Sequence, residues 1–190
     1  MNDTFVENKL FKGIDYTINS LDKGEYDNCT FVNCIFSDSD LSMIHFIECE
    51  FDNCNLGMAK MNGVVLNDVN FTQCKLLGID FHNCDTYLFS AKFKDCVLNL
   101  ASFYKLKLNH AKFTNCILQE VDFIETNLTS SIFDNCDLSR AVFENTILEK
   151  ADFRSSYNYS INPEINKIKN AKFSLSGIVG LLEKYNLEID

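Results

Sequence analysis

Large apolar side chains recur at every fifth position along most of this chain. One column of phenylalanines advances in steps of twenty residues, with a single step of twenty-two. Its members are Phe31, Phe51, Phe71, Phe93, Phe113, Phe133 and Phe153. A five-residue period suits neither the 3.6-residue period of an α-helix nor the two-residue alternation of a strand. A fixed internal period instead predicts a solenoid, in which each turn buries its apolar residues against its neighbours.

Folding the sequence at twenty residues per turn produces four apolar columns, which alternate between Phe-rich and Leu-rich. Large rings would therefore face one another across a square tube. This pattern predicts an all-β fold, a quadrilateral parallel β-solenoid with four five-residue sides per turn. At ~4.8 Å per coil, roughly six and a half coils give a body about 30 Å long.

The triplets around three of these rings carry a family resemblance. Ala111–Phe113, Val121–Phe123 and Ala151–Phe153 follow an A(D/N)LXX-like pattern, which resembles that of the pentapeptide-repeat family. The resemblance spans residues 26–153, and it implies a right-handed quadrilateral β-helix. A fold of this kind does not by itself fix a function.

We expect the whole chain, 1–190, to form one domain. Residues 1–25 would make an irregular first coil that covers the N-terminal end of the tube, because an open solenoid end exposes unpaired strand edges. Regular repeats would fill 26–153, with a two-residue slip near 85–87. Residues 154–173 would form an irregular last coil with a loop, and 174–187 a short C-terminal α-helix. The chain has no apolar run long enough to cross a membrane, and its first residues lack the basic and apolar regions of a secretory signal, so we expect neither a membrane span nor a signal peptide.

The slip lengthens one side of the tube from five residues to seven. The apolar period resumes at Leu88, so we expect Leu88 to point inward and the extra residues to bulge outward. Tyr87 and Phe89 would then project from the tube. Two interpretations stay open: an aromatic anchor for a partner, or a tolerated insertion whose rings lie on the surface.

Six of the nine cysteines form one column at a small, inward-facing position: Cys34, Cys54, Cys74, Cys96, Cys116 and Cys136. Cβ atoms stacked ~4.8 Å apart are too distant for a relaxed disulfide, which needs about 3.8 Å. We therefore expect free, buried thiols and a reduced, cytoplasmic protein. A polar column precedes the cysteines, and we expect its side chains to bond backbone groups of neighbouring coils. It comprises Asn33, Asn53, Gln73, Asp95, Asn115 and Asn135.

The sequence offers little for catalysis. His45, His82 and His110 occupy different outward positions in different coils, so no nucleophile–base pair is indicated. No phosphate-binding loop or metal-ligand spacing is present. We expect no enzyme activity, no catalytic residues, no metal and no cofactor.

The formal net charge is −10, which disfavours direct nucleic-acid binding and suits a basic partner or simple solubility. One side of the tube, here called the acidic side, would carry more acids than bases. Its acids are Asp40, Asp80, Asp122, Glu125 and Glu144, opposed by Lys60 and Lys105. A second side carries an apolar patch, which either marks a partner site or consists of singly exposed residues without a role. The patch comprises Met58, Leu77, Val97, Leu100 and Ile117.

A short acidic tube that ends in a helix is similar to the Qnr and MfpA-type branch of the family. That resemblance implies a DNA-like rod that dimerises through its C-terminal end and engages DNA gyrase. The present sequence departs from the branch in its short bulge, its late loop around Pro163 and its thinly spread acidity. Our sequence-based function is therefore a non-enzymatic interaction protein, a DNA mimic acting on a type II topoisomerase. The alternative is a structural scaffold that binds an unknown cytoplasmic protein through the apolar patch or through Tyr87 and Phe89.

The C-terminal helix also suggests a homodimer. Leu175, Val179 and Leu182 would cover the end of the tube, leaving further apolar residues in need of a second surface. The expected dimer interface comprises Leu175, Ile178, Val179, Leu181, Leu182 and Tyr185. In the rival arrangement, the loop at 157–163 folds back over these residues and leaves a monomer.

Overall fold

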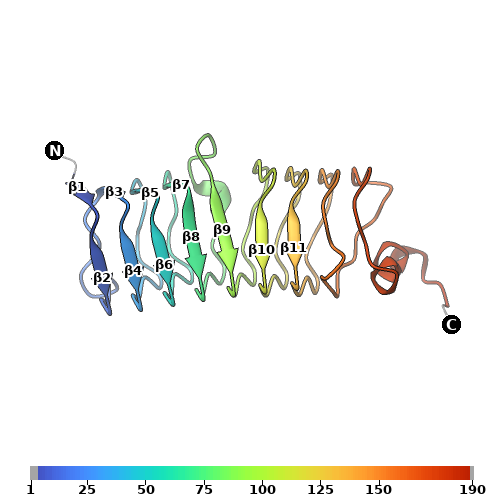
Figure 1. Ribbon diagram of the computed structural model, residues 1–190, viewed down its shortest axis with the longest axis horizontal. Coiled ribbons are helices and arrows are strands. Elements are labelled where there is room, and N and C mark those ends of the chain that lie inside the picture. Colours follow the sequence, from blue (N-terminus) through green and yellow to red (C-terminus); the bar gives the residue numbers. More distant parts are fainter. Residues whose placement is uncertain (1–3, 189–190) are drawn as a thin grey trace.

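The computed structural model describes residues 4–188, and within them the chain winds into a four-sided solenoid (Figure 1). Two parallel sheets line two of its sides. The smaller sheet comprises β1 (Thr4–Glu7), β3 (Gly24–Asp27), β5 (His45–Ile47) and β7 (Val65–Asn67). The larger one comprises β2 (Leu10–Lys12), β4 (Thr30–Val32), β6 (Glu50–Asp52), β8 (Val69–Thr72), β9 (Ala91–Lys94), β10 (Lys112–Thr114) and β11 (Ile132–Asp134). This architecture confirms the parallel β-solenoid predicted from the five-residue period.

The strand register follows the sequence columns. Phe31 pairs with Phe51, and Phe51 pairs with Phe71, each twenty residues apart in parallel strands. The single long step, Phe71 to Phe93, keeps the same column. Isolated parallel bridges such as Val97 to Ile117 continue the ladder on the sides that lack full strands.

The interior is a set of stacked rings. All seven members of the predicted phenylalanine column are buried. Successive rings of this column stack with centroids between 4.7 and 5.4 Å apart. The ring of Phe113 also meets Phe123 of the facing column edge-on, at 6.1 Å and 79°. Offset stacks and edge-to-face contacts are the arrangements that aromatic pairs prefer, so the columns fill the tube without a mismatch.

The corners of the tube require left-handed backbone at many residues. Asn33, Asn53 and Asn115, for example, have φ of 55°, 50° and 52°. Asparagine tolerates this region better than most residues, which explains its recurrence there. Instead of bonding backbone groups, as we expected, these side chains mostly bond one another: Asn53 Nδ2 donates to Asn33 Oδ1 at 2.7 Å. The polar column is thus an amide ladder on the outside of a corner.

The two extra residues bulge from the wall just before β9, on the side of the tube that β7 lines in the preceding coil. The backbone N–H of Ser90 donates to the carbonyl of Leu66 at 2.8 Å, which closes the wall behind the insertion. The prediction for Leu88 and Phe89 is wrong. Leu88 is 47% exposed, whereas Phe89 packs against the core and meets the ring of Phe81 at 5.9 Å. Phe81 begins a short 3₁₀ helix, η1 (Phe81–Asn83), on the preceding side.

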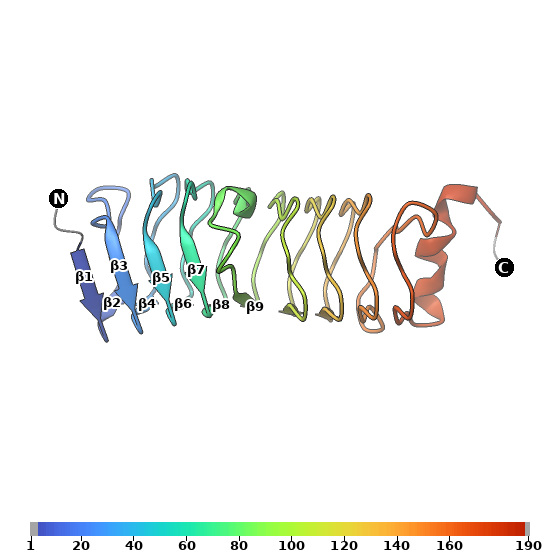
Figure 2. The ribbon, with the colours of Figure 1, turned by 90° about the horizontal axis from the view of Figure 1, so that it is seen from above.

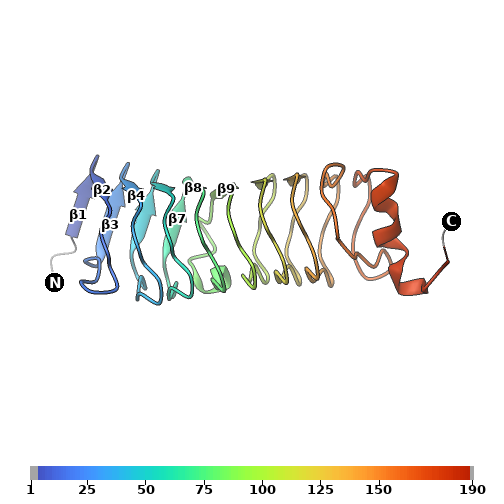
Figure 3. The ribbon, with the colours of Figure 1, turned by 90° about the horizontal axis from the view of Figure 1, so that it is seen from below.

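The C-terminal segment lies across the end of the tube (Figures 2 and 3). It contains two 3₁₀ helices, η2 (Ser176–Leu181) and η3 (Glu183–Tyr185), in place of the expected α-helix. Gly177 and Gly180, both poor helix formers, lie within this segment. At the other end, β1 and β2 pair in register with β3 and β4, and Phe11 stacks on Phe31 at 4.8 Å. Among residues 4–188, no helix has the length and apolar character needed to span a membrane.

Candidate interaction surfaces

Three acids of the acidic side hold the turns of the tube. Asp40 accepts a hydrogen bond from the backbone N–H two residues later, that of Ser42, at 2.9 Å. Asp80 and Asp122 do the same at 3.1 and 2.7 Å. Hydrogen bonds from Ser42, together with Lys23, lower the pKa of Asp40 to about 2. Such Asx turns explain why Asp or Asn recurs at this position of the repeat.

Lysines offset part of the remaining charge on this side. Lys23 Nζ lies 3.3 Å from Asp40 Oδ1, and Lys105 Nζ lies 3.6 Å from Glu125 Oε2. Glu144 is exposed and forms no ion pair with any residue of 4–188. The acidic side is therefore a weaker anionic surface than its carboxylate count suggests.

A stronger charge asymmetry runs along the tube. Residues 1–90 carry 14 acidic and 5 basic side chains, a net charge of −9. Residues 91–190 carry 13 acidic and 12 basic side chains, a net charge of −1. Summing charge by side of the tube hides this difference, whereas summing it by half of the chain would have found it. Almost all of the excess negative charge belongs to the N-terminal half.

The apolar patch is more continuous than its sequence pattern indicated. Met58, Leu77, Leu100 and Ile117 are 40% to 57% exposed, and Val97 lies beside Ile117. In the sequence column, Gly78 stands between Met58 and Leu100. The Met58 side chain, however, lies over Gly78, with its sulfur where a Cβ of residue 78 would be. The methionine thus fills the gap.

The bulge presents one aromatic ring to solvent. Tyr87 is 91% exposed, and its backbone N–H donates to Asp85 Oδ1 at 2.8 Å. Phe89 is anchored in the core instead. Of the two predicted anchors, only Tyr87 is available to a partner.

At the C-terminal end, the side chains differ in part from the expected interface. Leu175, expected to cover the tube, is 89% exposed, and Ile178, Val179 and Tyr185 are also exposed. Leu181 packs against the core, and Leu182 is half-buried. The face that meets the tube instead contains Gly177 and Gly180. Both lie against Tyr159, whose buried hydroxyl has no hydrogen-bond partner among residues 4–188.

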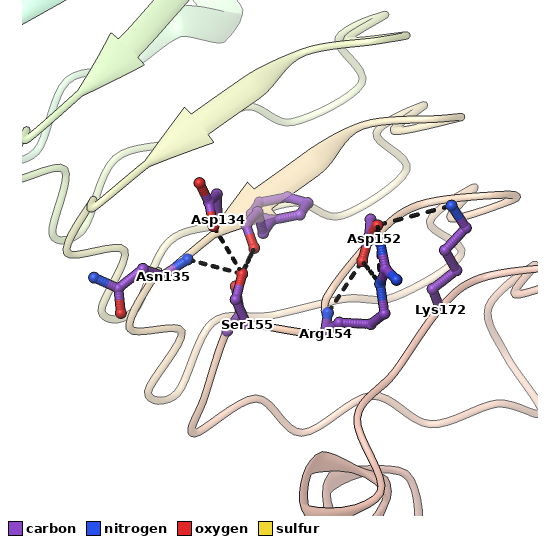
Figure 4. A network of polar contacts seen from close by, with 8 residues as sticks. Asp134, Asn135, Asp152, Arg154, Ser155 and Lys172 are labelled. Carbon is purple, nitrogen blue, oxygen red and sulfur yellow. Dashed lines mark hydrogen bonds and ion pairs between the residues drawn. The ribbon is translucent and has the colours of Figure 1, made fainter.

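A polar network fastens the last coils to one another (Figure 4). Asp152 binds Arg154 of its own coil, with Nη2 to Oδ2 at 2.7 Å, and Lys172 of the next coil at 3.8 Å. Ser155 Oγ donates to Asp134 Oδ1 at 3.0 Å and accepts from the N–H of Asn135 at 3.1 Å. These contacts link three successive coils near the end that carries η2.

Comparison with known proteins agrees with this geometry. The model of the pentapeptide repeat region matches residues 25–87 and 86–162. The chain belongs to the pentapeptide-repeat family. No curated protein matches its sequence.

Two solved structures show the extent of the likeness. A trypsin-treated form of QnrB1, a plasmid-mediated fluoroquinolone resistance protein, is 17% identical, with a TM-score of 0.76. The match covers 98% of this chain and 92% of QnrB1. HetL, a pentapeptide-repeat protein involved in heterocyst differentiation regulation in the cyanobacterium Nostoc, is 16% identical, with a TM-score of 0.57 and coverages of 92% and 86%. At these identities the likeness concerns the fold.

The cysteine thiols of this pentapeptide-repeat tube are buried, and most donate hydrogen bonds to its backbone. All nine cysteines are free and buried. Cys54 Sγ, for example, donates to the carbonyl of Phe31, in the coil before, at 3.3 Å. Burial raises the pKa of Cys49 to about 12. Within residues 4–188, no group of three or more His, Cys, Asp or Glu side chains could hold a metal ion.

Proposed function

We propose that this protein is a non-enzymatic interaction protein that acts as an acidic DNA mimic on a type II topoisomerase such as DNA gyrase. One observation carries the proposal: a tube of stacked coils bears a net charge of −9 on its first 90 residues. A negative rod can enter a basic groove that otherwise binds DNA. The nine free, buried thiols support a reducing compartment such as the cytoplasm.

In this proposal, the N-terminal half enters the groove and the C-terminal end joins two copies. The exposed apolar residues Leu175, Val179 and Leu187 support an end-to-end homodimer. We expect Leu175→Asp with Val179→Asp to convert that dimer into a folded monomer. Leu100→Asp is the control, because the exposure of Leu100, 57%, lies between those of Val179 (48%) and Leu175 (89%), but Leu100 lies mid-tube. A wild type that light scattering finds monomeric at micromolar concentration would end the dimer hypothesis.

A binding and supercoiling assay with purified gyrase tests the mimicry. Three neutralised acids in the N-terminal half should weaken gyrase binding roughly tenfold at low salt, because they remove long-range attraction to a basic groove. The substitutions are Glu7→Gln, Asp38→Asn and Glu48→Gln. Three neutralised acids in the other half form the control, which should bind nearly as the wild type does. These are Glu144→Gln, Glu149→Gln and Glu188→Gln. Equal loss in both variants, or no binding by the wild type, would reject the proposal.

The apolar patch favours a second candidate function, that of a scaffold for another protein. Four of its side chains stand 40% to 57% exposed around the Met58–Gly78 contact. Binding through this patch should change little with ionic strength, whereas binding by mimicry should weaken steeply. Leu100→Asp together with Ile117→Asp should abolish scaffold binding and leave gyrase binding intact.

A further inference from the structure

The middle strand of the seven-stranded sheet is β8. Its strands lie in the order β11-β10-β9-β8-β6-β4-β2, so β8 has three neighbours on each side. Figure 1 shows these strands side by side along the tube. The two-residue insertion does not disturb them, because Asn70 still pairs with Lys92 and Thr72 with Lys94. The outward surface of these seven strands is here called the sheet face.

Charges on the sheet face have opposite signs on the two sides of β8. β6 presents Glu50 and Asp52, whereas β9 presents Lys92 and Lys94 at the same two column positions. The outermost strands also carry opposite charges, with the basic residue on β2 and the acidic one on β11. At matching positions, β2 presents Leu10 and Lys12, and β11 presents Ile132 and Asp134. Leu10 is 65% exposed and Ile132 is 43% exposed, so both apolar side chains lack cover.

We propose that the sheet face binds the sheet face of a second copy of this chain, with the two tubes antiparallel. A two-fold axis that lies along β8 keeps each column opposite itself and exchanges β6 with β9, β4 with β10, and β2 with β11. Four charged or apolar pairs then meet complementary residues, whereas Lys112 faces Thr30 and Val32 faces Thr114. The pairs, each made twice, are Glu50 with Lys92, Asp52 with Lys94, Lys12 with Asp134, and Leu10 with Ile132. Such self-complementarity is what an isologous interface requires.

Other arrangements of the same two faces are less favourable. If the tubes ran parallel, Glu50 would face Asp52 and Lys92 would face Lys94, which places like charges together. A shift of one coil toward the C-terminal end would set Lys12 against Arg154. Only the register centred on β8 pairs both acid–lysine sets and both apolar residues.

The groups that would form the contact are largely free in the single chain. Within residues 4–188, Glu50, Asp52 and Lys94 form no ion pair, and Lys92 binds only Asp68, at 2.8 Å. A hollow of about 500 Å³ lies over β6, β8, β9 and β10. Small polar residues on the axis, Asn70 and Thr72, line it and leave room for a close approach.

Size and charge determine how strong the contact should be. Seven strands at ~4.8 Å make a face only about 30 Å long. The area buried would lie at the low end of specific interfaces, below about 1,200 Å². We therefore expect a weak association that depends on ionic strength, because most of its contacts are exposed ion pairs.

Charge exchange tests the proposal. One variant carries Glu50→Lys with Asp52→Lys, and the other carries Lys92→Glu with Lys94→Glu. Each variant alone should be repelled by its own copies and sediment as a smaller species than the wild type at low salt. Mixing the two should restore association, because positions 50, 52, 92 and 94 are then all basic on one face and all acidic on the other. Self-association of each variant at the wild-type level would overturn the proposal.

Cross-linking separates this contact from an end-to-end dimer. Thr72 lies on the proposed axis and would face its own copy, so oxidised Thr72→Cys should form a covalent dimer at low salt. Thr114→Cys is the control, because Thr114 would face Val32 and should not cross-link to itself. In an end-to-end dimer, the two copies of residue 72 lie several coils apart. Efficient cross-linking of Thr114→Cys, or none of Thr72→Cys in a sample shown to be folded, would reject the sheet-face dimer whatever the outcome for gyrase.

Discussion

The backbone oxygen of Tyr159 occupies the place where a Cβ on Gly180 would lie. The N–H of Ile161 also donates to the carbonyl of Gly180 at 2.9 Å, so the two segments approach backbone to backbone. The φ of Gly180 is not in the left-handed region, so backbone conformation does not require a glycine here. The close approach of the two segments does, because it leaves no space for a Cβ. This contact seats the 3₁₀ helices on the last coil.

Gly180→Ala should therefore loosen the C-terminal cap. The added methyl group meets backbone rather than a flexible side chain, so we expect a loss of about 1–3 kcal/mol in the free energy of unfolding. Urea denaturation measures it. Gly57→Ala is the control, since a Cβ there would meet its nearest atom, Asn55 Oδ1, at 3.4 Å. Equal stability of the two variants would contradict the role given to Tyr159.

Phe113→Ala should destabilise the tube by roughly 3–5 kcal/mol, because it opens a cavity in the stack. The ring is fully buried and stacks on Phe93 at 5.3 Å and on Phe133 at 5.0 Å. Phe5→Ala provides a control of the same chemistry at an exposed site, where we expect a change within about 0.5 kcal/mol. A loss below about 1 kcal/mol for Phe113→Ala would argue against continuous stacking.

The fold was predictable because one repeated choice, a large apolar residue at each fifth position, fixes the register. Once Phe31 lies above Phe51, every other column follows from the same period. The strand pairing bears this out, including the step from Phe71 to Phe93. Free, buried cysteines followed from the same geometry.

The exceptions lie where the period stops. In the bulge, Leu88 falls at the position that the five-residue period predicts to be buried. The wall resumes only at Ser90, however, so Phe89 packs against the core in its place. In the C-terminal segment, the apolar pattern suggested that leucines would cover the tube. Leu181 does pack against the core, but Leu175 is exposed, and Gly177 and Gly180 make the close contact with Tyr159, which leaves no room there for larger residues. Asp40 and Asp122 accept hydrogen bonds from backbone N–H groups of the turns, whereas the sequence analysis considered only the charge of these residues.

Thiol reagents should label few cysteines in the native protein and all nine after denaturation. Each cysteine is buried, so a reagent cannot reach its sulfur in the folded tube. For Cys49, burial also raises the pKa to about 12 and disfavours the reactive thiolate. Mass spectrometry after timed alkylation at pH 8 gives the count. Thr114→Cys adds an outward-facing thiol that should react quickly and show that the reagent is active. Rapid native labelling of Cys96 or Cys116 would contradict the inward assignment.

Acid should weaken the tube in part through Asp40. Hydrogen bonds from Ser42, with help from Lys23, lower the pKa of Asp40 to about 2 in the folded protein. An unfolded Asp titrates near 3.9, so this carboxylate stabilises the fold above about pH 4. That contribution is lost as the pH falls from about 4 toward 2. Asp40→Asn removes the charge but keeps an acceptor for the Ser42 N–H, as Asn55 does for Gly57 at 3.1 Å. The melting temperature of Asp40→Asn should therefore fall less steeply than that of the wild type across this range. Glu149→Gln should follow the wild type, because the Glu149 carboxylate accepts no turn hydrogen bond within residues 4–188. If Asp40→Asn and wild type lose stability in parallel, the Ser42 hydrogen bonds do not hold Asp40 in its charged form.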